Sequence, residues 1–318
     1  MKLSGKGTIT LKISDVVIRL ASRFPLETLT EQVKQEQRLE RYEKFFCKGN
    51  RTPHINVKIK IVNKLPAITK KKRLFVTYHF EDGSENWRLF KNEKGYIFTC
   101  PLANKKQLMV VNKTFDKVTA YLLPKKSAGY VWTTSDIIYD FLQILLINYL
   151  AQRNQGIFTH AIGVKDIDGR GFVFAGKSGD GKTTTARLWH KHTKAMVLND
   201  DRIIVRKEAG TFVIYGSPWH GEFSDYLDSK IESARLNVLF FIHHSSKNVA
   251  EKVSGAEAFK LLYPALFPTF WDKEGLESIA SLCQHVIKNV PCYRLGFVND
   301  KSIITFVRKL SRSSESRI

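Results

Sequence analysis

The 318-residue chain has few cysteines, few acidic residues and no long apolar run. Its 4 cysteines are scattered and none shows C-x-x-C spacing, which argues against a zinc site or a disulfide framework and favours a reducing, cytoplasmic location. The longest apolar run, Ile137 to Leu150, contains polar residues and is too short to cross a bilayer, so we expect a core helix there and no membrane partner. Met1 to Lys12 lacks a continuous apolar stretch, so no signal peptide is expected.

The shortage of acids is uneven along the chain. The whole chain has 51 Lys+Arg against 30 Asp+Glu, a net charge of +21, and residues 1–130 hold 27 of these cations and 11 of these anions. Such a basic region can attract nucleic acid, an acidic protein or a membrane surface. A solvated lysine-rich surface is the simpler interpretation, because the aromatic residues near Lys70–Arg73 alternate like strand residues. Nucleic-acid binding is therefore a minor alternative.

Hydrophobic periodicity divides the chain into two parts. An apolar share of 43% and a mean hydropathy of −0.22 are typical of a globular protein with a buried core. Residues 1–130 show short alternating runs, clearest over 55–61, and predict a β-rich basic N-terminal module that is mostly antiparallel, with a polar helix over 27–46. A helix over 136–153, capped by Thr134 or Ser135, then leads into interleaved strands and helices. Residues 131–318 are therefore predicted to form an α/β catalytic domain with a terminal helix and a disordered tail from Ser311.

A glycine-rich stretch, Gly176–Thr183, fits the pattern G-x-x-x-x-G-K-[ST]. An apolar run over 171–175 precedes it and a helical pattern follows it, so the loop is expected between a buried strand and a helix N-terminus. Backbone N–H groups and the positive end of the helix dipole then form an anion site. The residues expected to bind the nucleotide phosphates are Gly176, Ser178, Gly179, Asp180, Gly181, Lys182, Thr183 and Thr184. Lys182 is expected on the β- and γ-phosphates and Thr183 on Mg²⁺.

Two adjacent carboxylates, Asp200 and Asp201, follow the apolar residues 196–198. If that strand ends beside the glycine loop, one carboxylate can serve Mg²⁺ and the other can accept the proton of an attacking hydroxyl. Adjacent carboxylates also repel each other, which can raise the pKa of one of them. A turn or a helix cap is the alternative, because Asp-Asp often supplies one.

Two further candidates accompany the acids. Gly216–Glu222 contains a proline and two glycines that fix an irregular backbone, and Glu222 is a candidate metal ligand in it. A turn with a packed Trp219 is the alternative. His160 lies on a predicted strand beside the loop strand and is either a core residue or an active-site group.

The ordered set of Thr159–Ala161, the glycine loop and Asn199–Asp201 resembles the HPr kinase/phosphorylase family, over roughly residues 130–310. Ser217–Glu222 and Pro291–Leu295 resemble its bacterial branch that is encoded beside peptide-maturation genes. The resemblance implies a phosphoenolpyruvate-carboxykinase-like P-loop domain, of α/β class, that uses ATP and Mg²⁺.

By position, the resemblance also implies roles for single residues. Lys182 and Thr183 match the phosphate and metal residues of the family, and His160 matches an active-site histidine. One aspartate matches the general base, for which we choose Asp200, so that the expected catalytic set is Asp200, His160 and Lys182. The expected metal ligands are Thr183, Asp201 and Glu222. The family's later arginine-glycine segment has no counterpart in this sequence, which leaves the acceptor open.

The sequence therefore predicts an ATP-dependent kinase that phosphorylates a hydroxyl, namely a serine or threonine of a peptide or small protein. The alternative is a nucleotide-dependent switch or ATPase that acts through partners without a phosphorylated product. The basic N-terminal module motivates this alternative. The acceptor, the ATP or GTP preference and the formation of a homo-oligomer stay open.

Overall fold

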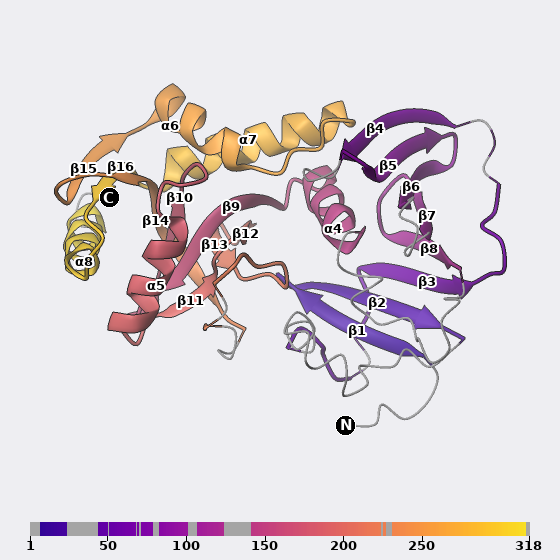
Figure 1. The fold of residues 1–318 in the computed structure, drawn as a ribbon, viewed down its shortest axis with the longest axis horizontal. Helices are drawn as coiled ribbons and strands as arrows, with labels where there is room; N and C mark the ends of the chain where they lie inside the picture. Colours follow the sequence, from indigo (N-terminus) through magenta and orange to yellow (C-terminus); the bar gives the residue numbers. More distant parts are fainter. Residues whose placement is uncertain are drawn as a thin grey trace. The chain divides into compact units, whose positions relative to one another are not determined.

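A computed structural model describes residues 7–23, 44–49, 51–67, 69, 71–78, 83–100, 107–123, 141–223, 225–226 and 231–315. The chain is a mixed α/β protein with two compact units, Met1–Tyr149 and Leu150–Ile318, each built on its own sheet (Figure 1). The sequence places the division at residues 130–131, whereas the contacts place it within helix α4 (Phe141–Gln152).

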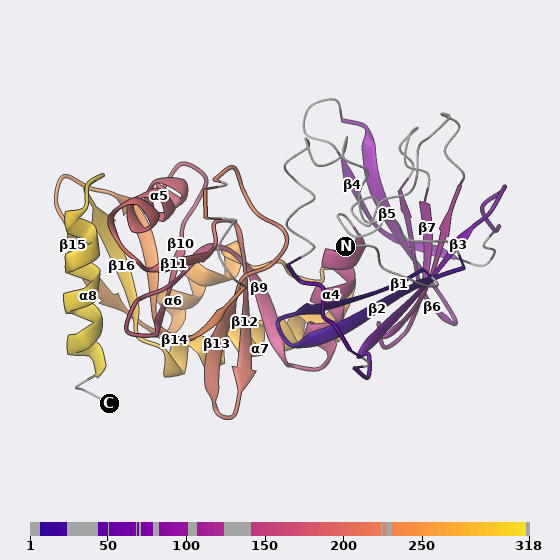
Figure 2. The ribbon, with the colours of Figure 1, turned by 90° about the horizontal axis from the view of Figure 1, so that it is seen from below.

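The N-terminal unit is a strongly twisted sheet, so that its edge strands point in different directions (Figure 2). Its strands are β1 (Thr8–Ile13), β2 (Val16–Ser22), β3 (Ile55–Ile61), β4 (Lys72–Tyr78), β5 (Glu85–Asn92), β6 (Gly95–Cys100), β7 (Gln107–Asn112) and β8 (Lys117–Leu122). Their order is β1-β2-β3-β8-β7-β6-β5-β4. β3 is parallel to both of its neighbours, and the other pairs are antiparallel.

Period-two alternation sets the two faces of this sheet. On β3, Ile55, Val57 and Ile59 are at most 3% exposed, whereas the intervening residues are exposed. The strand predicted over 55–61 is therefore confirmed. The helix expected over 27–46 lies largely outside the described residues, as do Thr134 and Ser135.

The C-terminal unit has a second eight-stranded sheet and five helical segments among its described residues. Its strands are β9 (Gly156–Lys165), β10 (Arg170–Ala175), β11 (Met196–Asn199), β12 (Arg202–Glu208), β13 (Thr211–Tyr215), β14 (Ser233–His244), β15 (Val249–Val253) and β16 (Cys292–Phe297). Its helices are α5 (Lys182–His192), α6 (Gly255–Leu262), the 3₁₀ turn η1 (Tyr263–Ala265), α7 (Lys273–Asn289) and α8 (Ser302–Glu315). The tail expected to be disordered from Ser311 is thus helical as far as Glu315, because α8 continues through it.

Strand pairing in this unit closes a circuit. β9 pairs with β12, β12 with β13, β13 with β14, β14 with β10, and β10 again with β9. The β10–β14 and β14–β16 pairs are parallel, so β10, β14 and β16 end at the same edge of the sheet. Loops that leave this edge are thereby brought together.

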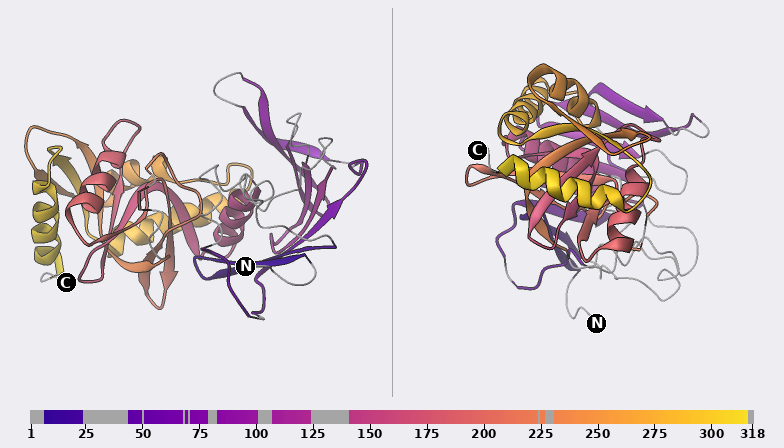
Figure 3. Two further views of the ribbon diagram at one scale, coloured as in Figure 1. Left: turned by 60° about the horizontal axis from the view of Figure 1, so that its bottom comes forward. Right: turned by 90° about the vertical axis from the view of Figure 1, so that its left-hand side faces the viewer.

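Helices cover both faces of the sheet (Figure 1). α6 and α7 pack on a core that includes Val173 and Phe241, and α5 and α8 pack on the opposite core with Phe172 and Phe240. Successive residues of β10 thus belong to different cores, which explains why all its residues are buried and why Gly171–Ala175 contains no polar side chain. Figure 3 shows α8 lying across the strands. No helix in the described part of the chain has the length and apolar character needed to span a membrane.

Candidate functional site

Strand register brings three distant segments to one edge of the C-terminal sheet. Ala175, the last residue of β10, pairs with Ala161 of β9, so His160 lies beside the start of the glycine loop. On the other side of β9, His160 pairs with Arg202 of β12. Asp201 directly precedes β12, and its carbonyl oxygen accepts a hydrogen bond from Ala161 N at 3.1 Å. The loop, the histidine and the acidic pair are therefore neighbours.

The glycine loop joins β10 to α5 with a backbone that requires glycine. Gly179 and Gly181 have φ values of 88° and 96°, in the left-handed region. A Cβ at Gly181 would lie 2.7 Å from Cζ of Phe297, so a side chain is excluded there by contact as well. Lys177 N donates to Asp180 Oδ2 at 2.6 Å, which holds the turn. The side chain of Asp180 therefore shapes the loop.

The N-terminus of α5 is open toward the loop. Gly181 is the N-cap residue, and no side chain caps the helix. The first N–H groups of a helix lack acceptors within it, and they carry the positive end of the helix dipole. Thr183 and Thr184 follow in the first turn, both half-buried. This helix end therefore presents donors to an anion.

Lys182 is folded back over the loop. Its Nζ donates to the carbonyl oxygens of Gly176 and Lys177, both at 2.9 Å. Burial lowers the pKa of Lys182, while the charges of Asp180 and Asp201 oppose that shift. An ammonium group has three protons, and the two carbonyls use two of them. The third is available to an anion, such as a phosphate.

Asp201 and His160 are in hydrogen-bond contact, with 2.6 Å between Nδ1 of the histidine and Oδ1 of the aspartate. The other carboxylate oxygen lies 3.0 Å from a guanidinium nitrogen of Arg202. Burial acts to raise the pKa of Asp201, but the hydrogen bond from His160 and the charges of Arg202, His160 and Lys182 outweigh it and leave that pKa lowered. Asp201 is therefore negatively charged, and its charge interacts with that of Lys182 in the loop.

The side chain of Asp200 is buried, with the residue 4% exposed. Its Oδ1 accepts hydrogen bonds from Gly221 N and from the Tyr226 hydroxyl, both at 2.8 Å, and its Oδ2 accepts one from Phe223 N at 3.0 Å. A general base needs an oxygen that its substrate can reach. The sequence suggested Asp200 as the general base. The geometry instead favours Asp201, because Asp201 is the acid that faces the loop.

Asn199 fixes the position of both acids. Its Nδ2 donates to the carbonyl oxygens of Ser217 and Trp219 at 2.9 and 3.0 Å, and its Oδ1 accepts from Asp201 N and Arg202 N at 2.8 and 2.6 Å. The side chain is 1% exposed and uses all its donors and acceptors. Trp219 is 1% exposed and packs against Phe158 as a core residue.

Glu222 lies between Gly221 and Phe223, the two residues whose backbone binds Asp200, and it is exposed. Within the ranges that the structure describes, no three His, Cys, Asp or Glu residues are grouped so as to hold a metal. A cation such as Mg²⁺ often takes only one or two carboxylates and completes its shell with substrate phosphates and water. Such a partial set needs no cluster of three side chains, so Thr183 stays a candidate ligand.

No family model and no curated protein matches this sequence. Among solved structures, the chain is similar to that of the Hpr(Ser) kinase/phosphatase from Coxiella burnetii. The similarity covers 50% of this chain and 95% of that chain, with a TM-score of 0.31 and 7% identity. A TM-score and a sequence identity this low say nothing about the activity of this chain.

Three residues of the site were missed in the sequence. Tyr226 binds Asp200, and Arg202 pairs with Asp201 while its guanidinium lies 5.0 Å from the ring centroid of Phe267. His244, at the end of β14, donates from Nε2 to the carbonyl oxygen of Gly179 at 2.8 Å. Arg202 could have been found, because it follows the acidic pair directly. Tyr226 and His244 carry no local signal.

Proposed function

We propose that the C-terminal unit is an ATP- and Mg²⁺-dependent phosphotransferase that moves the γ-phosphoryl group to a hydroxyl of a peptide or small protein. The observation that supports this proposal is the meeting of the glycine loop, Lys182 and the His160–Asp201 pair at one sheet edge. The P-loop character of the domain and its phosphoenolpyruvate-carboxykinase-like class are parts of the same proposal.

The loop and Lys182 would hold the triphosphate. The uncapped N-terminus of α5 supplies backbone donors, and Lys182 supplies a cation that is already desolvated. Both interactions strengthen in a site of low dielectric constant. Mg²⁺, held by Thr183 and phosphate oxygens, would neutralise charge on the transferring group.

Asp201 would orient the acceptor hydroxyl and take its proton. The acceptor oxygen then bonds to the γ-phosphorus, and the bond from that phosphorus to the bridging oxygen breaks, leaving its electron pair on ADP. A lowered pKa suits this task, because phosphoryl transfer passes through a loose transition state in which positioning matters more than basicity. The His160 contact keeps the carboxylate in one direction.

Asp200 would act as a positioning residue. Its three hydrogen bonds tie the segment 221–226 to the strand end that carries Asp201. The roles of base and metal ligand that the sequence suggested for the two aspartates are thus revised in this proposal. Glu222 keeps no role in it, since its exposed position adds nothing to the set.

The test uses γ-labelled ATP and a peptide library with a fixed serine or threonine. Asp201→Asn should retain nucleotide binding and lower transfer by about 10²-fold to 10⁴-fold, the usual contribution of a positioned acid–base group. Lys182→Ala should lose nucleotide binding. Transfer at the wild-type rate by Asp201→Asn would refute the assignment. Hydrolysis of ATP with no labelled peptide would instead support the switch or ATPase alternative, because the same pair can orient water.

A further inference from the structure

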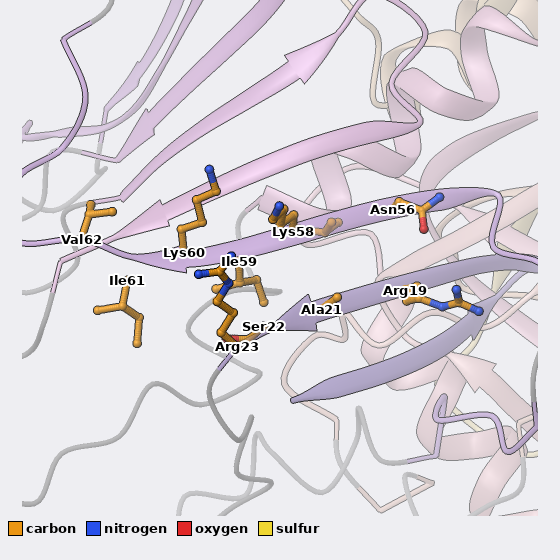
Figure 4. Close-up of a pocket in the computed structure, with 11 residues that line it drawn as sticks. Arg19, Ala21, Ser22, Arg23, Asn56, Lys58, Ile59, Lys60, Ile61 and Val62 are labelled. Atoms are coloured by element: carbon orange, nitrogen blue, oxygen red, sulfur yellow. The ribbon is translucent and has the colours of Figure 1, made fainter. Parts of the chain in front are cut away.

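A basic groove lies on the N-terminal unit, over β2 and β3, with a volume of about 630 Å³ (Figure 4). Its lining includes four cations: Arg19, Arg23, Lys58 and Lys60. Asn56 and Ser22 add polar groups, and Ala21, Ile61 and Val62 add apolar ones. No acidic residue belongs to this lining among the residues that the structure describes.

Strand register arranges the cations in two rows. β2 and β3 are parallel, with Arg19 opposite Asn56 and Ala21 opposite Lys58. Lys58 and Lys60 occupy alternate positions of β3 and are both exposed, so they project from the same face. Alternate residues of a strand are about 6.6 Å apart. Lys58 and Lys60 thus place two positive charges at the spacing of alternate residues in an extended chain.

Among the residues that the structure describes, Arg23, Lys58 and Lys60 form no ion pair with an acidic side chain. Lys60 lies 5.4 Å from the ring centroid of Tyr121, and Arg19 donates to the carbonyl oxygen of Arg51 at 3.0 Å. Like charges at neighbouring positions of a sheet repel each other. An anionic ligand would relieve that repulsion, so charge complementarity selects an acidic occupant.

We propose that this groove binds an extended acidic segment of the phosphoacceptor, with carboxylates at alternate residues. This step rests on the proposed phosphotransferase function. A peptide fits better than single-stranded nucleic acid, because nucleic-acid grooves pair cations with aromatic platforms for the bases, and the part of the groove lining that the structure describes contains no aromatic residue. The apolar residues Ile61 and Val62 suit the side chains between the carboxylates.

Docking on the N-terminal unit would favour the reaction by raising the local concentration of the acceptor. The two units belong to one chain, so an acceptor held by the groove meets the catalytic unit at a raised effective concentration. Loss of the groove should therefore raise KM for an acidic acceptor and leave kcat unchanged. ATP binding should stay as it is.

The experiment measures the fluorescence anisotropy of a short labelled peptide with glutamate at every second residue, without nucleotide. The full-length protein should bind it, and the same peptide with glutamine in place of glutamate should not bind. The double variant Lys58→Glu, Lys60→Glu should bind about tenfold more weakly or worse, because it removes and then reverses two ion pairs. If charge reversal prevents folding, the double variant Lys58→Gln, Lys60→Gln tests the same contacts by neutralising the two charges.

The matched control is Lys91→Glu, Lys94→Glu, which makes the same charge change at exposed positions of β5 and the turn after it. Equal losses in both double variants would overturn the proposal, since net charge alone would then explain binding. Absence of binding to the acidic peptide, or tighter binding to a uridine oligonucleotide, would also overturn it. Peptide binding without any phosphorylation would leave the groove in place and refute only the phosphotransferase function.

Discussion

The variant Asp200→Asn shows most clearly whether Asp200 is a positioning residue or the catalytic base. The wild-type carboxylate accepts three hydrogen bonds in a site that is 4% exposed. In the variant, the amide oxygen can keep the donors Gly221 N and Tyr226 hydroxyl. The amide nitrogen must then face Phe223 N–H, so that two donors oppose each other. One buried bond is lost and one buried donor stays unsatisfied.

The expected cost follows from those two changes. A hydrogen bond to a charged group is worth about 1.5–3 kcal/mol, and an unsatisfied buried donor costs about 1–3 kcal/mol. A total near 3 kcal/mol lowers Tm by roughly 6–12 °C for a unit of this size. The loss should appear in the free energy of unfolding. Nucleotide binding and transfer should follow the folded fraction.

Thermal unfolding followed by circular dichroism measures this shift, and Asp201→Asn is the matched control. The partners of Asp201, His160 and Arg202, have side chains 41% and 27% exposed, so water can replace the lost contacts. Asp201 itself is 13% exposed, but its partners are open to water, so the loss should be smaller, about 1 kcal/mol or roughly 3 °C. If Asp200→Asn melted like the wild type yet transferred no phosphate, the reasoning would fail and the base assignment would return to Asp200.

Three further predictions follow from single contacts. Gly181→Ala should abolish nucleotide binding, whereas Gly210→Ala, also at positive φ but with open space, should cost only about 1 kcal/mol, as unfolding and binding assays would show. Because the folded pKa of Asp201 is lowered, its charge and stabilising effect are complete above the ordinary value of 3.8 and are lost as pH falls through the lower folded value. A kcat profile should therefore show no loss from this group above 3.8. Burial raises the pKa of Cys283 and Cys292 to about 12, so a thiol reagent should label them only on unfolding, unlike the two half-buried cysteines of the N-terminal unit.

Local pattern predicted most strands and helices of this protein. The alternation over 55–61 and the sequence around the glycine loop each contain their own structural signal, and α5 begins at Lys182 as expected. β1 and β2 were missed because their connection uses Ser14 and Asp15 at φ values of 45° and 63°. Such turns usually carry glycine or asparagine. Without that signal, the two strands cannot be separated in the sequence.

The candidate site was predictable as a set of residues and not as an arrangement. Asp200 and Asp201 lie in the bend between β11 and β12, and their carboxylates have different partners: Asp201 contacts His160, whereas Asp200 accepts from Gly221 N. Which one faces the loop depends on the β9–β12 register, which places Arg202 opposite His160. It also depends on Tyr226, which arrives from a distant segment to bind Asp200. No local pattern contains either fact.

His244 and Phe297, at the ends of β14 and β16, stack with ring centroids 6.0 Å apart and contact the two left-handed glycines of the loop. The backbone of the glycine loop is therefore shaped by the fold itself, so the proposed phosphate site would be formed before a nucleotide binds. A preformed loop loses little conformational entropy when it binds a ligand, so most of the interaction free energy contributes to affinity. Association should then be limited by encounter and not by closure of the loop.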